Sequence, residues 1–201
     1  MPSFDLERGQ DGPVVGIDEA GRGPLAGPVI AAAVILDRDK VPRRLLRMID
    51  DSKVLTAEQR ERAEAGLRRC AGVTWAVAGA SVEEIDTRNI LQATFVAMRR
   101  ALARLPCRPM QALVDGNADP RLGMPVRLVI GGDGSSYSIA AASIIAKVTR
   151  DRLMCALALR YPGYSWESNK GYGSLYHMEA IERLGLTPHH RKSFAPAARL
   201  L

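Results

Sequence analysis

Four acidic residues lie at or just past the ends of apolar stretches in this sequence. Asp18 and Glu19 follow V-V-G-I, Asp115 follows A-L-V, and Asp133 comes after V-R-L-V-I-G-G. In α/β sheets, ligands collect at the carboxyl ends of the strands. Carboxylates gathered there repel one another unless a cation neutralises them, and oxygen ligands of this kind suit Mg²⁺ or Mn²⁺. A pair of such ions can assist an in-line displacement at a phosphate.

The two later acids also fit a purely structural role. V-D-G around Asp115 and G-D-G around Asp133 both fit turns, in which Asp is common. The adjacent pair Asp18 and Glu19 is harder to explain in this way, because it ends a strand that should be well buried. The residues alone leave the turn and the metal interpretations open for Asp115 and Asp133.

A flexible basic loop, G-R-G-P-L-A-G at residues 21–27, follows the first acid pair. Its glycines loosely resemble a dinucleotide-binding fingerprint, but the third glycine is one residue late and a strand follows instead of a helix. The better interpretation is a close approach of the backbone to a sugar-phosphate, with Arg22 supplying positive charge.

Two further sets of residues could contact a nucleic acid. Ser143, Lys147 and Arg150 are spaced four and three apart, so they share one face of a predicted helix and could follow a phosphate backbone. The alternative is an exposed face with an ion pair between Lys147 and Asp151. Tyr172, between two glycines, could stack on a sugar or base, or it could anchor its own loop.

The elements that must position these residues form a mixed α/β sheet with helices on its faces. Stretches rich in Val and Ile predict strands at 13–18, 28–36 and 72–80, the first two joined as an antiparallel pair. A fourth strand ends at Asp115 and a fifth ends near Asp133. Helices are predicted by a capping box and by apolar periodicity at about 56–69, 87–105, 136–160 and 175–184.

The composition fits a globular domain with a polyanionic partner. The chain has 201 residues and a net charge of +6, which favours such a partner without deciding it. No apolar run approaches the about 18 residues that would span a bilayer, and the first residues do not resemble a signal peptide. Cys70, Cys107 and Cys155 have no metal-type spacing. We therefore expect a cytoplasmic protein with reduced thiols and no contact with a membrane.

Several motifs together resemble bacterial ribonuclease HII. They occur in the family order: G-I-D-E-A-G-R-G-P-L-A-G-P-V at 16–29, D-D-S-K at 50–53, V-D-G-N at 114–117, A-A-S-I-I-A-K-V-T-R-D at 141–151, N-K-G-Y-G-S at 169–174 and H-H-R-K-S-F at 189–194. The resemblance implies a ribonuclease H-like fold, a five-stranded mixed sheet flanked by helices, with strands one to three antiparallel and a small C-terminal helical segment. We expect residues 1–160 to form the catalytic core and residues 161–201 to complete the substrate groove.

The resemblance also implies an endoribonuclease that uses two divalent ions, Mn²⁺ or Mg²⁺. Its substrates would be the RNA strand of RNA–DNA hybrids and single ribonucleotides embedded in duplex DNA. The cut would lie on the 5′ side of the ribonucleotide and leave 3′-hydroxyl and 5′-phosphate ends. Such an enzyme would remove ribonucleotides from DNA and RNA primers during DNA repair and replication, and we expect it to act as a monomer.

The resemblance assigns roles to the positions that match the family motifs. The catalytic and metal-binding acids fall on Asp18, Glu19, Asp115 and Asp133. The substrate-binding residues fall on Gly21, Arg22, Gly23, Ser52, Lys53, Ser143, Lys147 and Tyr172. Within this set, the Gly-Arg-Gly turn would recognise the 2′-hydroxyl largely through backbone groups, the tyrosine would pack on the ribose, and the serines and lysines would contact phosphates.

Two positions depart from the family pattern and bear on substrate affinity. Many members have Lys where this chain has Gly132 and Val54. Two other function classes fit less well. A non-catalytic binder of hybrid duplexes would lack at least one of the acids, and a Holliday-junction resolvase of the same fold would have no 2′-hydroxyl for a Gly-Arg-Gly turn to recognise.

The remaining titratable residues of interest receive other roles. Asp151 lies about four turns into a predicted helix, so we expect it to pair with a neighbouring Lys or Arg of that helix and not to be the fourth acid. We interpret His177, His189 and His190 as surface residues or phosphate contacts.

Overall fold

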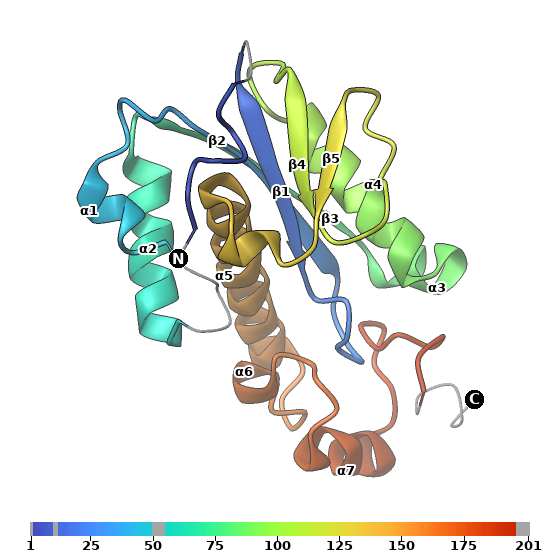
Figure 1. Ribbon diagram of the computed structural model, residues 1–201. Coiled ribbons are helices and arrows are strands. Elements are labelled where there is room, and N and C mark those ends of the chain that lie inside the picture. The colour runs from blue at the N-terminus through green and yellow to red at the C-terminus, as the bar shows by residue number, and fades with distance from the viewer. Residues whose placement is uncertain (1, 10–11, 50–54, 196–201) are drawn as a thin grey trace.

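A five-stranded mixed sheet forms the centre of the protein, whose computed structural model describes residues 2–9, 12–49 and 55–195 (Figure 1). The strand order is β3-β2-β1-β4-β5. Strands β1 to β3 are antiparallel neighbours, and β4 and β5 run parallel to β1. The strands are β1 (Val14–Ala20), β2 (Val29–Leu36), β3 (Val73–Ala80), β4 (Gln111–Asp115) and β5 (Val126–Val129). The predicted mixed sheet and its antiparallel first half are therefore confirmed.

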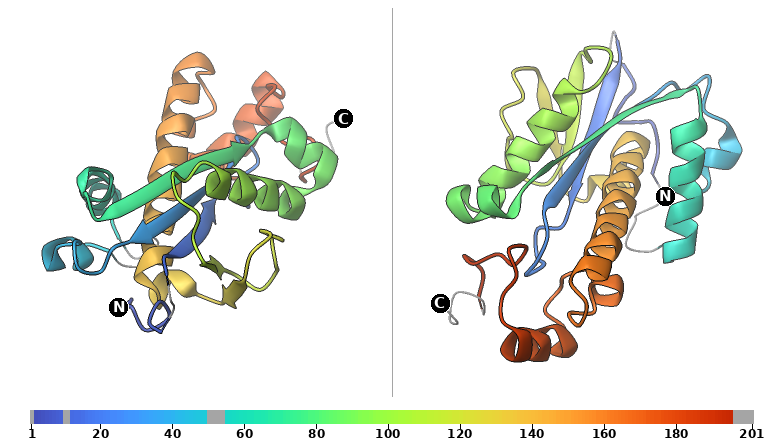
Figure 2. Two further views of the ribbon diagram at one scale, coloured as in Figure 1. Left: turned by 90° about the horizontal axis from the view of Figure 1, so that it is seen from above. Right: turned by 180° about the vertical axis from the view of Figure 1, so that it is seen from behind.

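Helices cover both faces of this sheet (Figure 2). One face carries α5 (Tyr137–Arg160), α2 (Ala57–Arg69) and the short α1 (Arg43–Leu46), and the other carries α3 (Val82–Arg88) and α4 (Ile90–Ala103). Side chains alternate along a strand, so Ala32 and Val34 of β2 pack toward α5 whereas Ala31 and Ala33 pack toward α4. This explains why the strand is apolar on both sides.

A close contact between α5 and β1 sets the position of the functional residues. A Cβ on Gly16 would lie 2.2 Å from the backbone carbon of Ser138, so only glycine lets the two backbones approach this closely. Asp18 lies two residues beyond Gly16 on the same face of β1, and Ser143 lies on the following turns of α5. The contact therefore brings Ser143 beside Asp18.

Two predicted elements have different bounds in the structure. The helix predicted at 87–105 is interrupted at Asn89, whose φ of 67° ends α3 and whose side chain accepts a hydrogen bond from the N–H of Gln92 to cap α4. With a ψ of 163°, this is a backbone conformation that residues with a side chain rarely adopt. Strand β5 ends at Val129, because Gly131 adopts a φ of 65° and starts the short 3₁₀ helix η1 (Gly132–Gly134). Asp133 therefore lies in a helical turn and not at a strand end.

The C-terminal residues pack against the far end of α5. Helices α6 (Trp166–Asn169) and α7 (Leu175–Leu184) form a third cluster of buried apolar residues with Met154 of α5 and Leu25 of the loop between β1 and β2. In the part of the chain that the structure describes, no helix combines the length and hydropathy needed to cross a membrane.

Candidate active site

A cavity of about 350 Å³ opens where β1 and β4 end, against one side of α5. Its lining consists of Asp18, Glu19, Ala20, Gly21, Arg60, Asp115, Ser143, Lys147, Arg150 and Tyr172. The structure thus brings together three of the four acids and four of the eight substrate-binding residues that the sequence predicts. Gly23 lies close by, since a Cβ on it would be 3.7 Å from Cε1 of the Tyr172 ring.

The sheet register places two of the acids side by side. Ile17 of β1 pairs with Val114 of β4, so the next residues along these parallel strands, Asp18 and Asp115, are neighbours. The carboxylate of Asp115 is held by the backbone N–H of Gly132, which donates to Oδ1 at 2.7 Å. Glu19 follows directly, and its Oε1 lies 3.5 Å from the Arg22 guanidinium.

Asp18 is 5 % exposed and lies beside the other two carboxylates. Burial raises the pKa of Asp18 well above its ordinary value, and the negative charges of Glu19 and Asp115 raise it further. Hydrogen bonds from the Glu19 N–H and the Ser143 hydroxyl act in the opposite direction. A divalent cation would remove the repulsion, and clustered carboxylates are the hard oxygen ligands that Mg²⁺ and Mn²⁺ take.

These residues therefore fit a hard divalent cation, although they do not form a finished binding cage. Among the residues with described positions, no three His, Cys, Asp or Glu side chains are arranged as a set of metal ligands. Sites for Mg²⁺ commonly use one or two carboxylates and leave the remaining positions to water and substrate phosphates. The open arrangement of Asp18, Glu19 and Asp115 is of this type.

Three predicted site residues that the structure describes, Arg22, Gly23 and Asp133, are not part of this lining. Asp133 is buried in η1, one residue after the N–H that binds Asp115, and it is absent from the residues that border the cavity. Its role as the fourth acid stays a prediction. Ser52 and Lys53 lie outside the described residues.

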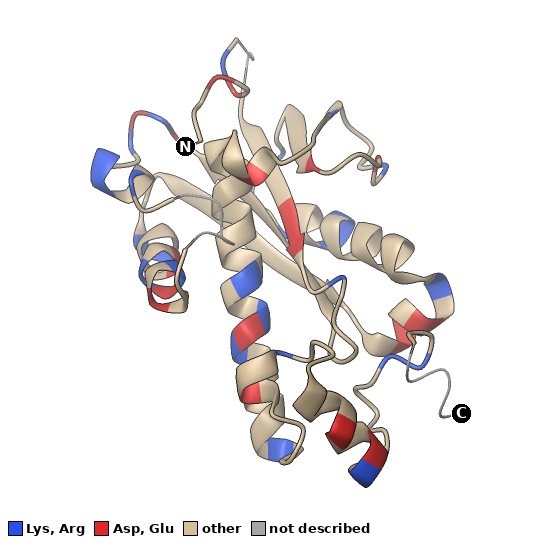
Figure 3. Cartoon of the chain, turned by 60° about the horizontal axis from the view of Figure 1, so that its bottom comes forward, with Lys and Arg blue, Asp and Glu red and all other residues tan. Residues whose placement is uncertain are grey.

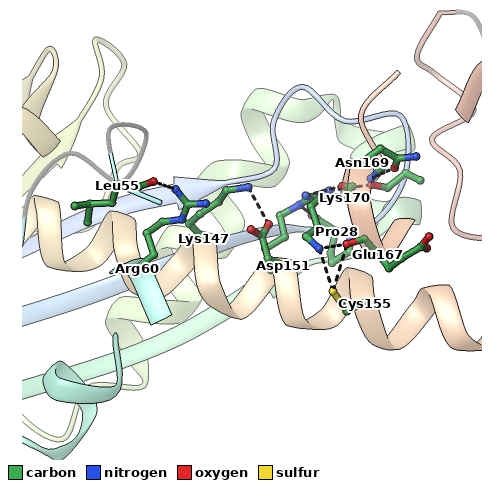
Figure 4. A network of polar contacts seen from close by, with 12 residues as sticks. Pro28, Leu55, Arg60, Lys147, Asp151, Cys155, Glu167, Asn169 and Lys170 are labelled. Atoms are coloured by element: carbon green, nitrogen blue, oxygen red, sulfur yellow. Dashed lines mark hydrogen bonds and ion pairs between the residues drawn. The ribbon is translucent and has the colours of Figure 1, made fainter. Parts of the chain in front are cut away.

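The polar face of α5 borders the cavity, and Figure 4 shows Lys147 and Asp151 joined on this helix. Ser143 and Arg150 are 4 % and 1 % exposed, so the alternative of a solvated helix face is wrong for them. Lys147 donates to Asp151 at 2.8 Å, which confirms the ion pair predicted for Asp151. In the charge view, α5 carries basic and acidic stretches beside the acids of β1 (Figure 3).

Arg60 of α2 is a cavity residue that the sequence analysis missed. It extends from the opposite side of the cavity toward α5 and donates to the backbone carbonyl of Leu55 (Figure 4). The helix that carries it is rich in arginine, including Arg62, Arg68 and Arg69, and nothing in their spacing distinguishes the one that faces the acids.

Comparison with known proteins identifies the family. A family model described as ribonuclease HII matches residues 15–197. The chain belongs to the ribonuclease HII family. Ribonucleases HII from Paramagnetospirillum magneticum and Rhodospirillum rubrum are each 55 % identical to it, over 204 and 201 residues. The matches cover 100 % of this chain and 99 % and 92 % of those relatives.

Solved structures confirm the ribonuclease H-like fold. Ribonuclease H2 from Pyrococcus horikoshii has a TM-score of 0.79 and 29 % identity, covering 94 % of this chain and 96 % of that one. Ribonuclease HII from Archaeoglobus fulgidus, solved as a complex with PCNA, has a TM-score of 0.74 and 26 % identity over 89 % and 93 % of the two chains. Family and fold together make this chain a ribonuclease H, a hydrolase that acts on RNA–DNA hybrids.

The histidines of this ribonuclease HII family member are not all surface residues. His177 and His190 are 0 % and 1 % exposed, so the predicted surface or phosphate-contact role is wrong for both. The Nδ1–H of His177 donates to the carbonyl of Tyr172 at 2.8 Å, and its Nε2 accepts from the indole N–H of Trp166 at 3.0 Å. The Nδ1 of His190 accepts from the N–H of Thr187, which leaves Nε2–H to donate to Nε2 of His177 at 3.1 Å.

This histidine pair anchors the loop that carries Tyr172. Burial lowers the pKa of His177, and burial with the neighbouring His177 charge lowers that of His190 to about 4. Both rings are therefore neutral at pH 7, in the tautomers that the hydrogen bonds require. The burial of His177 could have been predicted from helical periodicity, because His177 shares the buried face of α7 with Ala180 and Ile181.

Proposed function

We propose that this ribonuclease H is a divalent-metal-dependent endonuclease that cuts both RNA–DNA hybrids and duplex DNA containing a single ribonucleotide. The cut lies on the 5′ side of the ribonucleotide and leaves 3′-hydroxyl and 5′-phosphate ends. One observation carries the proposal: the cavity that holds Asp18, Glu19 and Asp115 is also lined by Gly21 and Tyr172. Groups suited to phosphate hydrolysis and groups suited to a sugar thus share one site.

The proposed metal ligands are the carboxylates of Asp18, Glu19, Asp115 and Asp133, which hold two Mg²⁺ or Mn²⁺ ions together with the substrate. When bound, such ions polarise the phosphate, lower the pKa of a water molecule and stabilise the departing oxygen. Burial raises the pKa of Asp18 and the charges of Glu19 and Asp115 raise it further, which supports this assignment. So does a ribonuclease HIII of the same fold that was solved in complex with Mn²⁺.

The chain itself orients the carboxylates and binds the substrate backbone. The Gly132 N–H fixes Asp115, and Ser143 and the Glu19 N–H fix Asp18. The ammonium of Lys147, steadied by Asp151, lies in the cavity wall where it can contact a phosphate. Such contacts set the register of the duplex without distinguishing base sequence.

Sugar recognition is assigned to the Gly-Arg-Gly turn and Tyr172. The 2′-hydroxyl both donates and accepts hydrogen bonds, so backbone groups at Gly21–Gly23 can distinguish RNA from DNA at one sugar. The Tyr172 ring is 47 % exposed and lies beside Gly23, which supports its assignment to packing on the ribose. Ser52 and Lys53 are assigned to phosphate contacts from the family motif. No histidine borders the described cavity, and the proposal gives none a role in proton transfer.

The C-terminal residues from 161 onward complete the substrate groove in this proposal. Tyr172 comes from that segment, whereas the other cavity residues come from the first 160. The enzyme acts as a monomer in the removal of single ribonucleotides from DNA and of RNA primers.

A DNA duplex with one ribonucleotide tests the proposal. The strand should be cut on the 5′ side of the ribonucleotide when Mg²⁺ or Mn²⁺ is present and should stay intact with EDTA, and the end groups follow from ligation and phosphatase treatment. The same duplex without the ribonucleotide and the Asp18→Asn variant serve as controls. Cleavage without divalent ions, a cut on the 3′ side, or equal cleavage of the all-DNA duplex would contradict the proposal.

A further inference from the structure

The Gly-Arg-Gly turn is held from beneath by Arg191, which is 0 % exposed. Its guanidinium donates three hydrogen bonds to backbone carbonyls of this turn and its continuation. Nη2 donates to Gly21 at 2.5 Å, Nη1 to Arg22 at 2.8 Å and Nε to Gly27 at 3.0 Å. No ion pair joins Arg191 to a carboxylate among the residues placed by the structure.

A second buried arginine holds the rest of the same loop. Arg150 of α5 donates to the carbonyls of Pro28 at 3.1 Å and Ala26 at 2.9 Å, and to the carbonyl of Lys170, two residues before Tyr172, at 2.9 Å. The two arginines thus donate to different carbonyls of the loop. Arg150 also packs closely against Gly21, but among the described residues only Arg191 donates hydrogen bonds to the carbonyls of the Gly-Arg-Gly turn.

The hydrogen bonds of Arg191 fix the direction of two peptide groups. In a trans peptide the C=O and the following N–H point in opposite directions. Because the carbonyls of Gly21 and Arg22 point at the buried guanidinium, the N–H groups of Arg22 and Gly23 point away from it. They are directed to the exposed side of the loop, where the Tyr172 ring lies beside Gly23.

The backbone around Arg191 is itself held on both sides. Its N–H donates to the carbonyl of Leu25 at 2.8 Å, and the N–H of Gly27 donates to the carbonyl of His189 at 2.8 Å. The Asp86 carboxylate of α3 accepts from the N–H groups of the next two residues, 192 and 193, at 3.0 and 2.9 Å. The guanidinium therefore has a defined position relative to the turn.

We propose that Arg191 is a positioning residue for ribose recognition, which aims the N–H groups of Arg22 and Gly23 at the 2′-hydroxyl side of the bound sugar. The inference rests on the proposed function and adds a residue to it. A positive charge at the carbonyl end of these peptides also polarises them and strengthens their N–H groups as donors. Lysine would keep the charge, but it lacks the planar fork that reaches three carbonyls at once.

The charge needed for this role is present at neutral pH. Burial and the nearby charge of Arg150 lower the pKa of Arg191 to about 9, while Asp86 acts in the opposite direction. The guanidinium is thus protonated under assay conditions near pH 7. The cost of burying the charge is offset by the three backbone carbonyls that accept hydrogen bonds from the guanidinium.

The test compares Arg191→Lys with a matched control, Arg99→Lys. Arg99 also donates to a backbone carbonyl, that of Pro120 at 2.7 Å, but it belongs to α4 and lies outside the cavity. Binding is measured with Ca²⁺ in place of Mg²⁺, using one DNA duplex with a single ribonucleotide and the same duplex without it. We expect Arg191→Lys to lower the ratio of the two affinities about tenfold, with all-DNA affinity unchanged, and Arg99→Lys to leave the ratio unchanged.

A spectroscopic measurement separates positioning from general loosening. In the parent, the ribonucleotide duplex should shift the amide ¹H–¹⁵N signals of Arg22 and Gly23 further than the all-DNA duplex does. In Arg191→Lys this extra shift should disappear, while amide signals of the β2 strand stay at their parental positions. A merely structural role would spread changes through the loop without removing the response to the 2′-hydroxyl.

Each outcome decides the proposal. A folded Arg191→Lys variant with the parental affinity ratio would overturn it. If that variant fails to fold in a thermal melt, Asp86→Ala takes its place, because it removes the carboxylate that holds residues 192 and 193 while Arg191 itself is kept. A several-fold fall in the ratio is then expected, and a parental ratio refutes the role of Arg191. A parent enzyme without preference for the ribonucleotide duplex would instead refute the proposed function, and this inference with it.

Discussion

Acidification should destabilise this protein through the buried pair His177 and His190. In the folded protein the Nδ1 of His190 faces the N–H donor of Thr187, and Nε2 of His177 faces two donors, so neither nitrogen has room for another proton. The unfolded chain has no such restriction. Below the ordinary histidine pKa the unfolded state binds protons that the folded state does not, so stability falls as the pH falls.

The size of the effect follows from the pKa of His190. Its folded value is about 4 and its ordinary value is 6.5, so stability is fully present above about pH 6.5 and is lost progressively down to about pH 4. With about 1.36 kcal/mol for each pH unit, the complete loss is about 3.4 kcal/mol. Between pH 7 and pH 5 the loss is about 1.8 kcal/mol. The pKa of His177 is lowered as well, so its contribution has the same sign.

Urea unfolding of the parent and of His190→Gln at pH 7 and pH 5 measures this contribution. The variant loses the titrating ring, so the other groups cancel when the two pH dependences are subtracted. The parent should lose about 1.8 kcal/mol more than the variant over this interval. His189→Gln is the matched control, since the pKa of His189 is also lowered by burial and by Arg160 but its ring lies outside the hydrogen-bonded pair.

Parallel pH dependences of the parent and His190→Gln would refute this reasoning. Parallel dependences would mean that the folded protein can hold His190 in its protonated form. The hydrogen bond from His177 to the Tyr172 carbonyl would then not depend on both rings being neutral.

Three substitutions test the site and its support. Asp18→Asn should abolish cleavage of an RNA–DNA hybrid. Without divalent ions it should also raise the thermal midpoint, because it removes a negative charge that burial, Glu19 and Asp115 disfavour. Normal turnover or a lower midpoint would refute this. Gly16→Ala should lower the free energy of unfolding, measured with urea, by about 1–3 kcal/mol, because its Cβ would lie 2.2 Å from the backbone of Ser138. A variant as stable as the parent would contradict this. Tyr172→Ala should reduce the preference for a single embedded ribonucleotide over a continuous hybrid in competition assays, with stability changed by less than about 0.5 kcal/mol because the ring is 47 % exposed. Phe at this position should behave like the parent, and an unchanged preference in the Ala variant would remove Tyr172 from ribose packing.

The sheet was predictable because its strands combine β-branched runs with clear boundaries. Predicted strands at 28–36 and 72–80 differ from β2 and β3 by one residue at their starts. Parallel pairing of β1 with β4 then makes Asp18 and Asp115 neighbours, which is what a cluster of acids at strand ends predicted. The arrangement of three acids could thus be inferred before the fold was known, since it depends on strand order and on little else.

Local backbone changes were harder to predict. The apolar positions that predict the helix at 87–105 all lie within α4, so they carry no sign that Asn89 separates α4 from α3. At the end of β5, the two glycines at 131 and 132 permit a strand or a turn equally, and the hydrogen bond from Gly132 to Asp115 selects the turn. This partner lies on another strand, so the position of Asp133 depends on a contact that local sequence does not contain.

The role of Arg191 illustrates a more general difficulty. An arginine that pairs with a carboxylate has a partner of a distinctive type, and charge patterns can suggest the pair. An arginine that donates to backbone carbonyls has as many candidate partners as the chain has residues, since each residue carries one such acceptor. The sequence suggested a surface or phosphate-contact role for the neighbouring His189 and His190 and none for Arg191, whose guanidinium is fully buried against Gly21, Arg22 and Gly27. Charge in a sequence identifies the donors, and only the fold determines whether they face a nucleic acid or the backbone loop that would recognise one.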